Sequence, residues 1–404
     1  MSTLLDTASL IVTPNGAKSG KLYSVVPSSG AGDLDVTRAT TATRVNSSGL
    51  IESVGTNIPR LDYSNGSCPS ILVEPQRTNV LTYSEALTPN FTFNQCSITS
   101  NQISPDGTNN AKRITNGATA TDVYFEQSVG ISVNTYTWSA YVKKGTDTSA
   151  TIKPVHVGIG GDVSLMTFTF ATETIVTSAA ITTSGFTKLT NGWYRIFCTV
   201  PITLAVISLR GRFGNSNTPN VYNEWFGVQL EVGSYATSYI PTTSASVTRN
   251  ADVIGKTGIS SLIGTEFTLF LDAYETIGGT STRYVVLKGT GGAYANALLI
   301  ESNSSNQLVV TLLNSGSSTI FGAISGSLTN GQRFKIAVTC KNNDFAVYVN
   351  GVQIATQTSG SVPTTSDLYL GYYTDYSDNY SKINTTALWK QRLTNSQLSQ
   401  LTTI

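Results

Sequence analysis

Short runs in which apolar and polar residues alternate are the feature that most limits how this chain can fold. Residues 136–143, 193–200 and 225–232 alternate in this way, and Gly, Pro or Asn residues bound the runs. Because successive side chains of a β-strand point to opposite faces, each run predicts a strand with one buried face. No segment between the runs has the spacing of a long amphipathic helix. The centre of the chain is therefore predicted to be a β-sandwich of the jelly-roll type.

A second set of alternating runs lies in the last third of the sequence. Residues 267–273 and 334–340 each gather apolar side chains on one face, and residues 345–349 lead into Asn350-Gly351. Asn-Gly between two alternating runs is the strongest short-range signal for a β-hairpin. These runs predict a second antiparallel sandwich.

The end of the chain has a helical signal. Residues 393–401 follow a predicted strand that ends at Trp389, and they favour one short helical turn. Thr394 or Asn395 would be its N-cap, because a hydroxyl or amide oxygen there accepts from a free backbone N–H of the first turn.

Changes in composition divide the chain into three predicted regions. Residues 1–85 are punctuated by Gly and Ser and lack long alternating runs, so they are predicted to form an irregular attachment or assembly module. Residues 86–248 hold the first set of strands, and residues 249–404 hold the second. The predicted fold class is all-β, with an irregular N-terminal module followed by two antiparallel β-sandwiches.

Charge is scarce in this chain. Lys and Arg number 25 and Asp and Glu number 24 among 404 residues, which is 12%, whereas globular domains average about 25%. With a net charge of +1 and no basic cluster, nucleic-acid binding is not expected. The single histidine, His156, argues against His-based catalysis and multi-His metal sites. Hydrophobic residues make up 40%, enough for a real core.

Neither a membrane segment nor a cofactor site is predicted. No run of about 18 apolar residues occurs, and the first ten residues lack the basic and apolar blocks of a secretory signal. The four cysteines are far apart and form no C-x-x-C pair, so a zinc site or a disulfide framework is not expected. We expect no metal and no cofactor.

Arginines recur in the N-terminal region, where carboxylates lie among them. The arginines are Arg38, Arg44, Arg60 and Arg77. One interpretation is that internal ion pairs hold loops in place. The alternative is that these arginines bind an acidic partner surface at an assembly contact.

An ordered series of motifs runs through the first 250 residues and includes TRATTATR at 37–44, ILVEPQRTN at 71–79 and GVQLEVG at 227–233. With this series, the first 250 residues resemble a recurrent module of structural proteins of tailed bacteriophages. The middle domain of such proteins is similar to carbohydrate-binding jelly rolls. The resemblance implies a virion fibre, spike or decoration protein.

The last 150 residues contain a second series of motifs, which are RFKIAV at 333–338, AVYVNG at 346–351, LYLG at 368–371 and ALWKQRLTNSQL at 387–398. With these motifs, the region resembles the laminin-G-like, concanavalin A-like sandwich. Glycan recognition is the usual role that the resemblance implies for such sandwiches.

Two places supply the aromatic rings and polar groups that sugars require. Tyrosine rings stack on the CH faces of sugars, and carboxylates and amides bind their hydroxyl groups. The first candidate glycan site is a loop with Tyr372, Tyr373, Asp375, Tyr376, Asp378 and Tyr380. The second is the strand entry with Tyr222 and Trp225. In both places the alternative is packing within the fold or against a neighbouring subunit. Asp375, Asp378 and Asn379 could also bind Ca²⁺, but their spacing does not match the helix–loop–helix calcium pattern.

Three functions are compatible with these features. The first is a non-enzymatic tail or head fibre or spike on the virion surface, which binds host-surface polysaccharide or glycoprotein during attachment. The second is a purely architectural head fibre or decoration protein, assembled with other virion proteins in the host cytoplasm. The third is a polysaccharide depolymerase, although no nucleophile or metalloprotease motif is present and the protein is not expected to be an enzyme. A homo-oligomer is expected, and a trimer by analogy with phage fibres.

Overall fold

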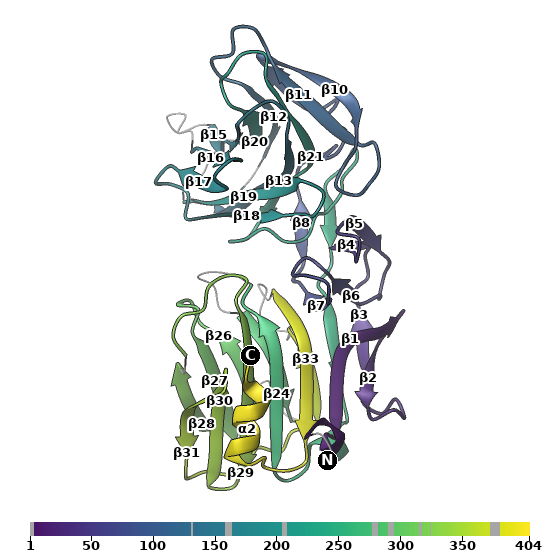
Figure 1. The fold of residues 1–404 in the computed structure, drawn as a ribbon, viewed down its shortest axis with the longest axis vertical. Helices are drawn as coiled ribbons and strands as arrows, with labels where there is room; N and C mark the ends of the chain where they lie inside the picture. The colour runs from purple at the N-terminus through teal and green to yellow at the C-terminus, as the bar shows by residue number, and fades with distance from the viewer. Residues whose placement is uncertain are drawn as a thin grey trace. The chain divides into compact units, whose positions relative to one another are not determined.

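Nearly all regular structure in this protein is β-strand. The computed structural model describes residues 4–130, 132–157, 164–203, 208–276, 282–289, 295–314, 317–323, 325–371 and 380–404. The chain divides into two compact units, and each is described by itself (Figure 1). Unit 1 comprises Met1–Thr41, Val54–Gln76 and Asn250–Ile404, and unit 2 comprises Ala42–Ser53 and Arg77–Arg249. The predicted all-β fold class is confirmed.

Unit 1 is built around one long antiparallel sheet. Its strands are β1 (Leu10–Lys18), β2 (Lys21–Val26), β3 (Leu34–Thr37), β6 (Arg60–Asp62), β7 (Ser70–Val73), β23 (Val253–Lys256), β24 (Phe267–Tyr274), β25 (Thr282–Lys288), β26 (Asn296–Ser302), β27 (Leu308–Asn314), β28 (Ser317–Ala323), β29 (Arg333–Lys341), β30 (Asp344–Val349), β31 (Val352–Gln357), β32 (Asp367–Leu370) and β33 (Ser381–Trp389). They pair in the order β28-β27-β26-β25-β32-β23-β3-β2-β1-β33-β24-β29-β30-β31, and β7 joins β6 to β33.

Strands from both ends of this order share one core, so the sheet folds back on itself as a sandwich. Leu269 on β24 and Phe334 on β29 belong to the same cluster of buried side chains as Leu298 on β26 and Leu308 on β27. Alternation explains the arrangement, because every second residue of each strand points into this core. The predicted C-terminal sandwich is therefore present.

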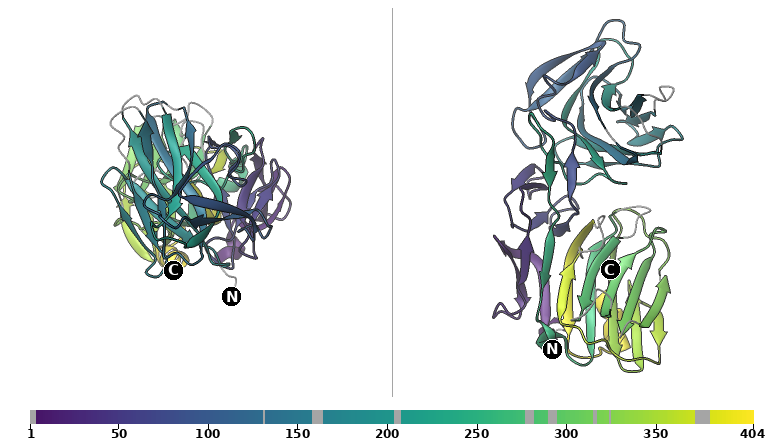
Figure 2. Two further views of the ribbon diagram at one scale, coloured as in Figure 1. Left: turned by 90° about the horizontal axis from the view of Figure 1, so that it is seen from above. Right: turned by 180° about the vertical axis from the view of Figure 1, so that it is seen from behind.

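The N-terminal strands close one side of this sandwich. β1 pairs with β33 of one half, and β3 pairs with β23 of the other, so β1, β2 and β3 link the two halves (Figure 2, purple strands). Their buried side chains in the core are Leu10, Val12, Leu22, Leu34 and Val36. Strands β1, β2 and β3 of the N-terminal region thus belong to the sandwich, although their short runs gave no regular alternation in the sequence.

The predicted hairpin and C-terminal helix are both confirmed. Asn350 and Gly351 connect β30 to β31 with φ angles of 49° and 86°, the left-handed region that a tight hairpin turn requires. α2 (Asn395–Thr402) begins after Thr394, whose side chain accepts from the backbone N–H of Gln397 in a capping box. Its Leu398 packs on the outer face of the sheet. Two other short elements are η1 (Leu4–Thr7) and α1 (Ser260–Ile263).

Unit 2 holds a second sandwich of two antiparallel sheets, together with two separate two-stranded sheets. Its strands are β4 (Ala42–Val45), β5 (Ile51–Val54), β8 (Arg77–Asn79), β9 (Thr92–Asn94), β10 (Cys96–Gln102), β11 (Ala111–Asn116), β12 (Tyr124–Val129), β13 (Asn134–Lys144), β14 (Ser149–Ile152), β15 (Val155–Val157), β16 (Met166–Thr169), β17 (Thr174–Thr177), β18 (Thr183–Lys188), β19 (Trp193–Ile202), β20 (Ser208–Asn215), β21 (Tyr222–Val232) and β22 (Val247–Arg249). One sheet has the order β10-β11-β21-β13-β19-β18, and the other has the order β17-β16-β14-β20-β12-β9 with β15 beside β20.

Aromatic side chains fill the space between the two sheets of unit 2. Trp138, Trp225, Phe125 and Phe213 are all fully buried there. The outer face of the first sheet has its own apolar cluster, on which Ile51 of β5 packs. This contact explains why residues 42–53 belong to unit 2.

The predicted region boundaries at residues 85 and 248 stay a prediction. The two units are drawn from chain segments that alternate along the sequence, and the first 76 residues contribute to both.

Candidate functional site

Most of the predicted glycan loop lies outside the described residues. Tyr372, Tyr373, Asp375, Tyr376 and Asp378 fall in the range 372–379, of which nothing is described. Tyr380 is half-buried, and its carbonyl oxygen accepts from the Thr276 hydroxyl at 2.5 Å. The loop therefore stays a prediction.

Trp225 is a core residue, which corrects its prediction as a sugar platform. Its side chain is 0% exposed, and its indole N–H donates to Oδ1 of Asn215 at 3.0 Å. Gly227 has a φ of 59°, and the pairing of β13 with β21 shifts register at this point. This is the signature of a β-bulge, which places Trp225 and Val228 on the same buried face. Simple alternation cannot predict such a shift.

Tyr222, the other candidate on this strand, is half-buried and partly covered. The guanidinium of Arg113 lies over its ring at 4.0 Å and also donates to Glu224 at 3.2 Å. Gly145 also lies close to the Tyr222 ring, because a Cβ atom at that position would clash with a ring carbon. Little of the Tyr222 ring is therefore free to stack on a ligand.

Two of the four N-terminal arginines form a buried ionic cluster inside unit 1. Arg38 and Arg60 are 1% and 0% exposed. Arg60 pairs with Glu74 at 2.6 Å and with Asp252, and Arg38 pairs with the other oxygen of Asp252 at 2.8 Å. We call these four residues the buried cluster. The predicted internal ion pairs are confirmed here.

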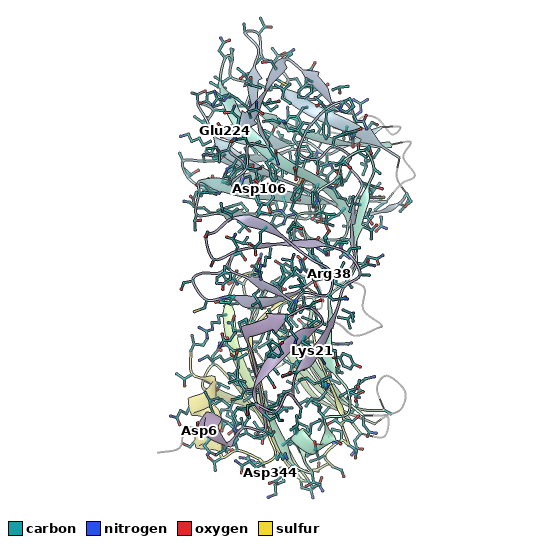
Figure 3. All side chains as sticks on the ribbon, turned by 90° about the vertical axis from the view of Figure 1, so that its right-hand side faces the viewer. Asp6, Lys21, Arg38, Asp106, Glu224 and Asp344 are labelled. Carbon is teal, nitrogen blue, oxygen red and sulfur yellow. The ribbon has the colours of Figure 1, made fainter. Side chains whose placement is uncertain are left out.

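The guanidinium of Arg38, labelled in Figure 3, is fully occupied within the chain. It donates five hydrogen bonds, and its acceptors are the carbonyl oxygens of Thr40, Val54, Gly55 and Ile58 and the carboxylate of Asp252. Because a guanidinium has five N–H donors, none remains for a partner. This corrects the alternative that Arg38 binds an acidic partner surface at an assembly contact, and the burial of Arg60 argues in the same way.

The other two arginines belong to unit 2. Arg44 forms an ion pair with Glu52 at 2.5 Å, and the side chain of Arg44 is 23% exposed. The guanidinium of Arg77 lies 5.2 Å from the centre of the Tyr235 ring. A role of these two in assembly stays a prediction.

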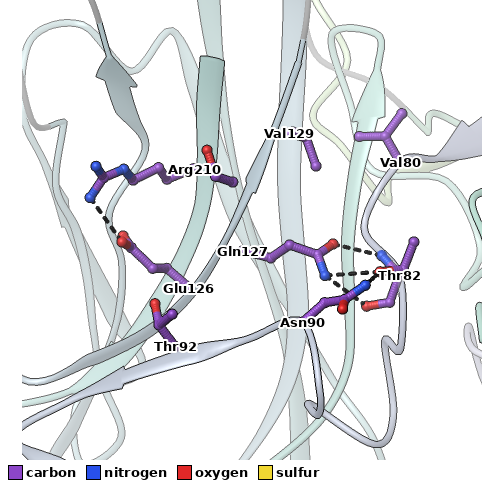
Figure 4. Close-up of a pocket in the computed structure, with 9 residues that line it drawn as sticks. Val80, Thr82, Asn90, Thr92, Glu126, Gln127, Val129 and Arg210 are labelled. Carbon is purple, nitrogen blue, oxygen red and sulfur yellow. Dashed lines mark hydrogen bonds and ion pairs between the residues drawn. The ribbon is translucent and has the colours of Figure 1, made fainter. Parts of the chain in front are cut away.

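A hollow in unit 2 brings together polar groups that the sequence analysis did not select. Its volume is about 530 Å³, within the usual range for small-molecule sites of roughly 300–1,000 Å³. Its lining residues are Val80, Thr82, Asn90, Thr92, Glu126, Gln127, Ser128, Val129 and Arg210 (Figure 4).

The hollow forms where β9 ends before its neighbour β12 does. β9 pairs with β12 only as far as Thr92 opposite Glu126, whereas β12 continues to Val129. The segment around Thr82 lies beside this continuation, because its backbone N–H donates to Gln127 at 2.7 Å. Space therefore remains between β12, the end of β9 and the segment from Val80 to Thr82.

Ion pairs define one wall of the hollow. Glu126 accepts from Arg210 at 2.8 Å through one oxygen and from Arg212 at 2.6 Å through the other. The guanidinium of Arg212 also lies 3.7 Å from the centre of the Tyr124 ring. Figure 4 shows Arg210 and Glu126 side by side, opposite Gln127, Thr82 and Asn90.

The sequence holds only a weak signal for this wall. Glu126 on β12 and the pair Arg210 and Arg212 on β20 alternate with buried residues, which predicts an outward face for each. Their meeting depends on the register that sets Glu126 opposite Arg212, and a single sequence does not reveal that register.

No metal centre occurs within the part of the chain that the structure describes, where no three His, Cys, Asp or Glu side chains are grouped to hold an ion. Cys68, Cys96, Cys198 and Cys340 are free thiols. In the same described residues, no helix has the length and apolarity needed to cross a bilayer.

Comparison with known proteins relates the C-terminal part of unit 1 to a family. Residues 262–399 match the model of the concanavalin A-like lectin/glucanases superfamily, of the laminin-G type. This region is a laminin-G-like, concanavalin A-like lectin domain. The match covers part of the sandwich, since β1, β2, β3 and β23 lie before it. No curated protein sequence matches the chain.

Solved structures with partial likeness include carbohydrate-binding proteins. The CBM40 module of the Ruminococcus gnavus IT-sialidase, bound to α2,3 sialyllactose, is 14% identical to this chain with a TM-score of 0.30. The aligned region covers 35% of this chain and 84% of the CBM40 chain. A heptameric SAP-like pentraxin from Limulus polyphemus is 14% identical with a TM-score of 0.28, and the aligned region covers 34% of this chain and 69% of the pentraxin chain. A leech intramolecular trans-sialidase is 16% identical with a TM-score of 0.30, and the aligned region covers 35% of this chain and 24% of the trans-sialidase chain. These likenesses concern fold alone.

Proposed function

We propose that this chain is a glycan-binding fibre or spike protein of a bacteriophage virion. The observation that carries the proposal is the match of residues 262–399 to the concanavalin A-like lectin/glucanases superfamily. Lectins and glucanases have different activities, but both recognise glycans. Glycan recognition is therefore the function that the lectin domain supports best.

The second sandwich supports the same function. The hollow in unit 2 is lined by hydroxyl, amide, guanidinium and carboxylate groups, which bind sugar hydroxyls, and by Val80 and Val129, which suit the CH faces of a ring. Scarce charge over the rest of the chain leaves mainly Ser, Thr, Asn, Gln and Tyr for other contacts.

The proposed virion role rests on the ordered motifs between residues 37 and 249 that resemble tailed-bacteriophage structural proteins. In this proposal the chain lies on the virion surface, contacts other virion proteins and forms a homo-oligomer. Labelling intact particles with an antibody against the chain tests the location, and the mass of the purified protein in solution tests the oligomer.

Binding without catalysis is proposed because of how the hollow places its charges. Glycosidases use two carboxyl groups roughly 5–10 Å apart. Among the residues that line the hollow, Glu126 supplies the one carboxylate, and two arginines hold it in ion pairs. The hollow therefore lacks the pair of carboxyl groups that glycoside hydrolysis uses.

An array of bacterial surface glycans, probed with the intact labelled protein, tests the proposal. We expect saturable binding to a subset of glycans, competed by the free saccharide. Absence of saturable binding across the array would refute glycan recognition. The bound polysaccharides should keep their chain length during incubation, and shortening would instead favour a depolymerase.

A further inference from the structure

Arg210 is the group in the hollow with unused binding capacity. Its side chain is 34% exposed, so water or a ligand can reach the guanidinium. Of its five N–H donors, one is used in a side-chain hydrogen bond to a described residue, Oε1 of Glu126 at 2.8 Å. The remaining N–H groups can donate to a ligand without breaking the bond to Glu126.

The ion-pair network to which Arg210 belongs has one more cation than it has carboxylates. Glu126 is shared between Arg210 and Arg212, and Asp122 accepts from Lys153 at 2.8 Å. The network of three cations and two carboxylates therefore has a net charge of +1, and Arg210 and Glu126 are its members that line the hollow. In a chain with so few charges, an anion is the ligand that this excess favours.

The planar guanidinium matches one anion especially well. A carboxylate can take two parallel N–H bonds from the same guanidinium, and such charge-assisted bonds are roughly twice as strong as neutral ones. Glu126 takes one N–H of the Arg210 guanidinium (Figure 4), so a ligand carboxylate can bind N–H groups that this bond leaves unused.

The other groups around the hollow suit the hydroxyls of a sugar ring. Thr92 is exposed at the end of β9, and its hydroxyl makes no hydrogen bond to the described residues. Asn90 is exposed, and its amide nitrogen donates to the Thr82 hydroxyl at 2.9 Å, which leaves the amide oxygen as an acceptor. A cavity of about 530 Å³ has room for a small saccharide.

We propose that the hollow in unit 2 binds a carboxylated saccharide unit, with the carboxylate on Arg210 and ring hydroxyls on Thr92 and Asn90. This inference rests on the proposed glycan-binding function and assigns one of its sites to unit 2. Two classes of sugar carry this chemistry, the uronic acids and the nonulosonic acids.

Calorimetric titration of the intact protein tests the inference. The probes are a glucuronate-containing tetrasaccharide and 3′-sialyllactose, and the neutral partners are the carboxyl-reduced tetrasaccharide and lactose. One or both carboxylated probes should bind at least about tenfold more tightly than the neutral partner, because a charge-assisted bond is lost with the carboxylate. The probe that binds identifies the sugar class.

Arg210→Gln should remove this tenfold preference while the protein stays folded. Arg113→Gln is the matched control, since Arg113 is 35% exposed, pairs with one carboxylate, belongs to the same unit and lies outside the hollow. It should bind as the parent does. Thr92→Val, at an exposed position, should weaken binding severalfold and serves if Arg210→Gln fails to fold.

Two results would overturn the inference about the hollow and leave the proposed glycan-binding function intact. One is glycan binding in which neither Arg210→Gln nor Thr92→Val lowers affinity. The other is equal binding of carboxylated and neutral probes. A loss of affinity in Arg113→Gln alone would move the site to the surface around Tyr222. Failure of every glycan on the array to bind refutes the proposed function itself.

Discussion

Two clusters of arginine and carboxylate groups in this chain contain the same chemistry but differ in access to solvent. In the buried cluster of unit 1, Arg60 is 0% exposed and lies between Glu74 and Asp252. In unit 2, Arg212 and Arg210 share Glu126, and their side chains are 9% and 34% exposed. In the first cluster the charges are paired with one another inside the fold, whereas the second ends in a partly exposed guanidinium with free donors.

The difference separates a structural use of arginine from a binding use. A buried charge must be compensated within the fold, since removing its partner leaves an ion in a low-dielectric interior at a penalty of several kcal/mol. A half-exposed charge is solvated by water and contributes about 0–1 kcal/mol to stability through its pair. We therefore expect stability to depend on the buried cluster and ligand affinity to depend on Arg210.

Buried thiols allow the stability of each unit to be measured separately. Cys340 in unit 1 and Cys198 in unit 2 are both 0% exposed, and burial raises the pKa of each well above its ordinary value. Each thiol should react only when its own unit unfolds. Cys68, which is exposed, and half-buried Cys96 are replaced by serine so that they do not react first.

The largest loss of stability is expected from deleting residues 1–36, which contain the strands that precede Arg38 of the buried cluster. Five buried aliphatic side chains leave the core of unit 1, at about 1.5–3 kcal/mol each, which together match a typical folding stability of about 5–15 kcal/mol. Labelling without denaturant should modify Cys340 and spare Cys198. Protection of Cys340 would mean that the lectin domain folds without the N-terminal strands.

Arg60→Met should lower the stability of unit 1 by about 3–5 kcal/mol, because Glu74 and part of Asp252 lose their partner. The denaturant midpoint for Cys340 labelling should fall, and the midpoint for Cys198 should not change. The control is Arg60→Met with Glu74→Met, which removes a charge of each sign and should recover part of the loss. Equal effects of the single and double variants would argue against an ionic cause.

Arg212→Met should have an intermediate effect, on unit 2. Arg212 is more accessible than Arg60, and Glu126 keeps Arg210 as a partner. We expect a loss of about 1–3 kcal/mol, the range for a hydrogen bond to a charged group. The midpoint for Cys198 labelling checks this, and a shift of the Cys340 midpoint instead would contradict the assignment of Arg212 to unit 2.

Arg210→Gln should change stability least, by no more than about 1 kcal/mol, since Arg210 is partly exposed and Glu126 keeps Arg212 as a partner. The comparison is sharpest here, because the change that hardly alters either midpoint is expected to have the largest effect on saccharide affinity. A drop of several kcal/mol in the stability of unit 2 would place Arg210 with the structural arginines.

Local patterns in the sequence predicted the local structure. The alternating runs, the Asn350-Gly351 turn and the cap at Thr394 depend on neighbouring residues, and all are present. The pairing of β1 with β33 joins residues that are far apart in the chain, so no local pattern indicates it.

The functional residues were harder to predict for the same reason. Trp225 was misassigned because a bulge at Gly227 changes which side chains face the core. Arg210 was not selected because the hollow exists only where β9 ends before β12. Strand register and strand length, rather than residue type, decide both cases.

One measurement tests glycan binding and its location together. The protein is held in denaturant near the unfolding midpoint of unit 2, and labelling of Cys198 and Cys340 is followed with and without a carboxylated saccharide. A ligand at 100 times its dissociation constant stabilises the unit that binds it by about 2.7 kcal/mol. We predict that the saccharide slows labelling of Cys198 in the parent protein and in Arg113→Gln, but not in Arg210→Gln. Unchanged labelling of Cys198 in the parent, at saturating saccharide, would contradict a glycan site in unit 2.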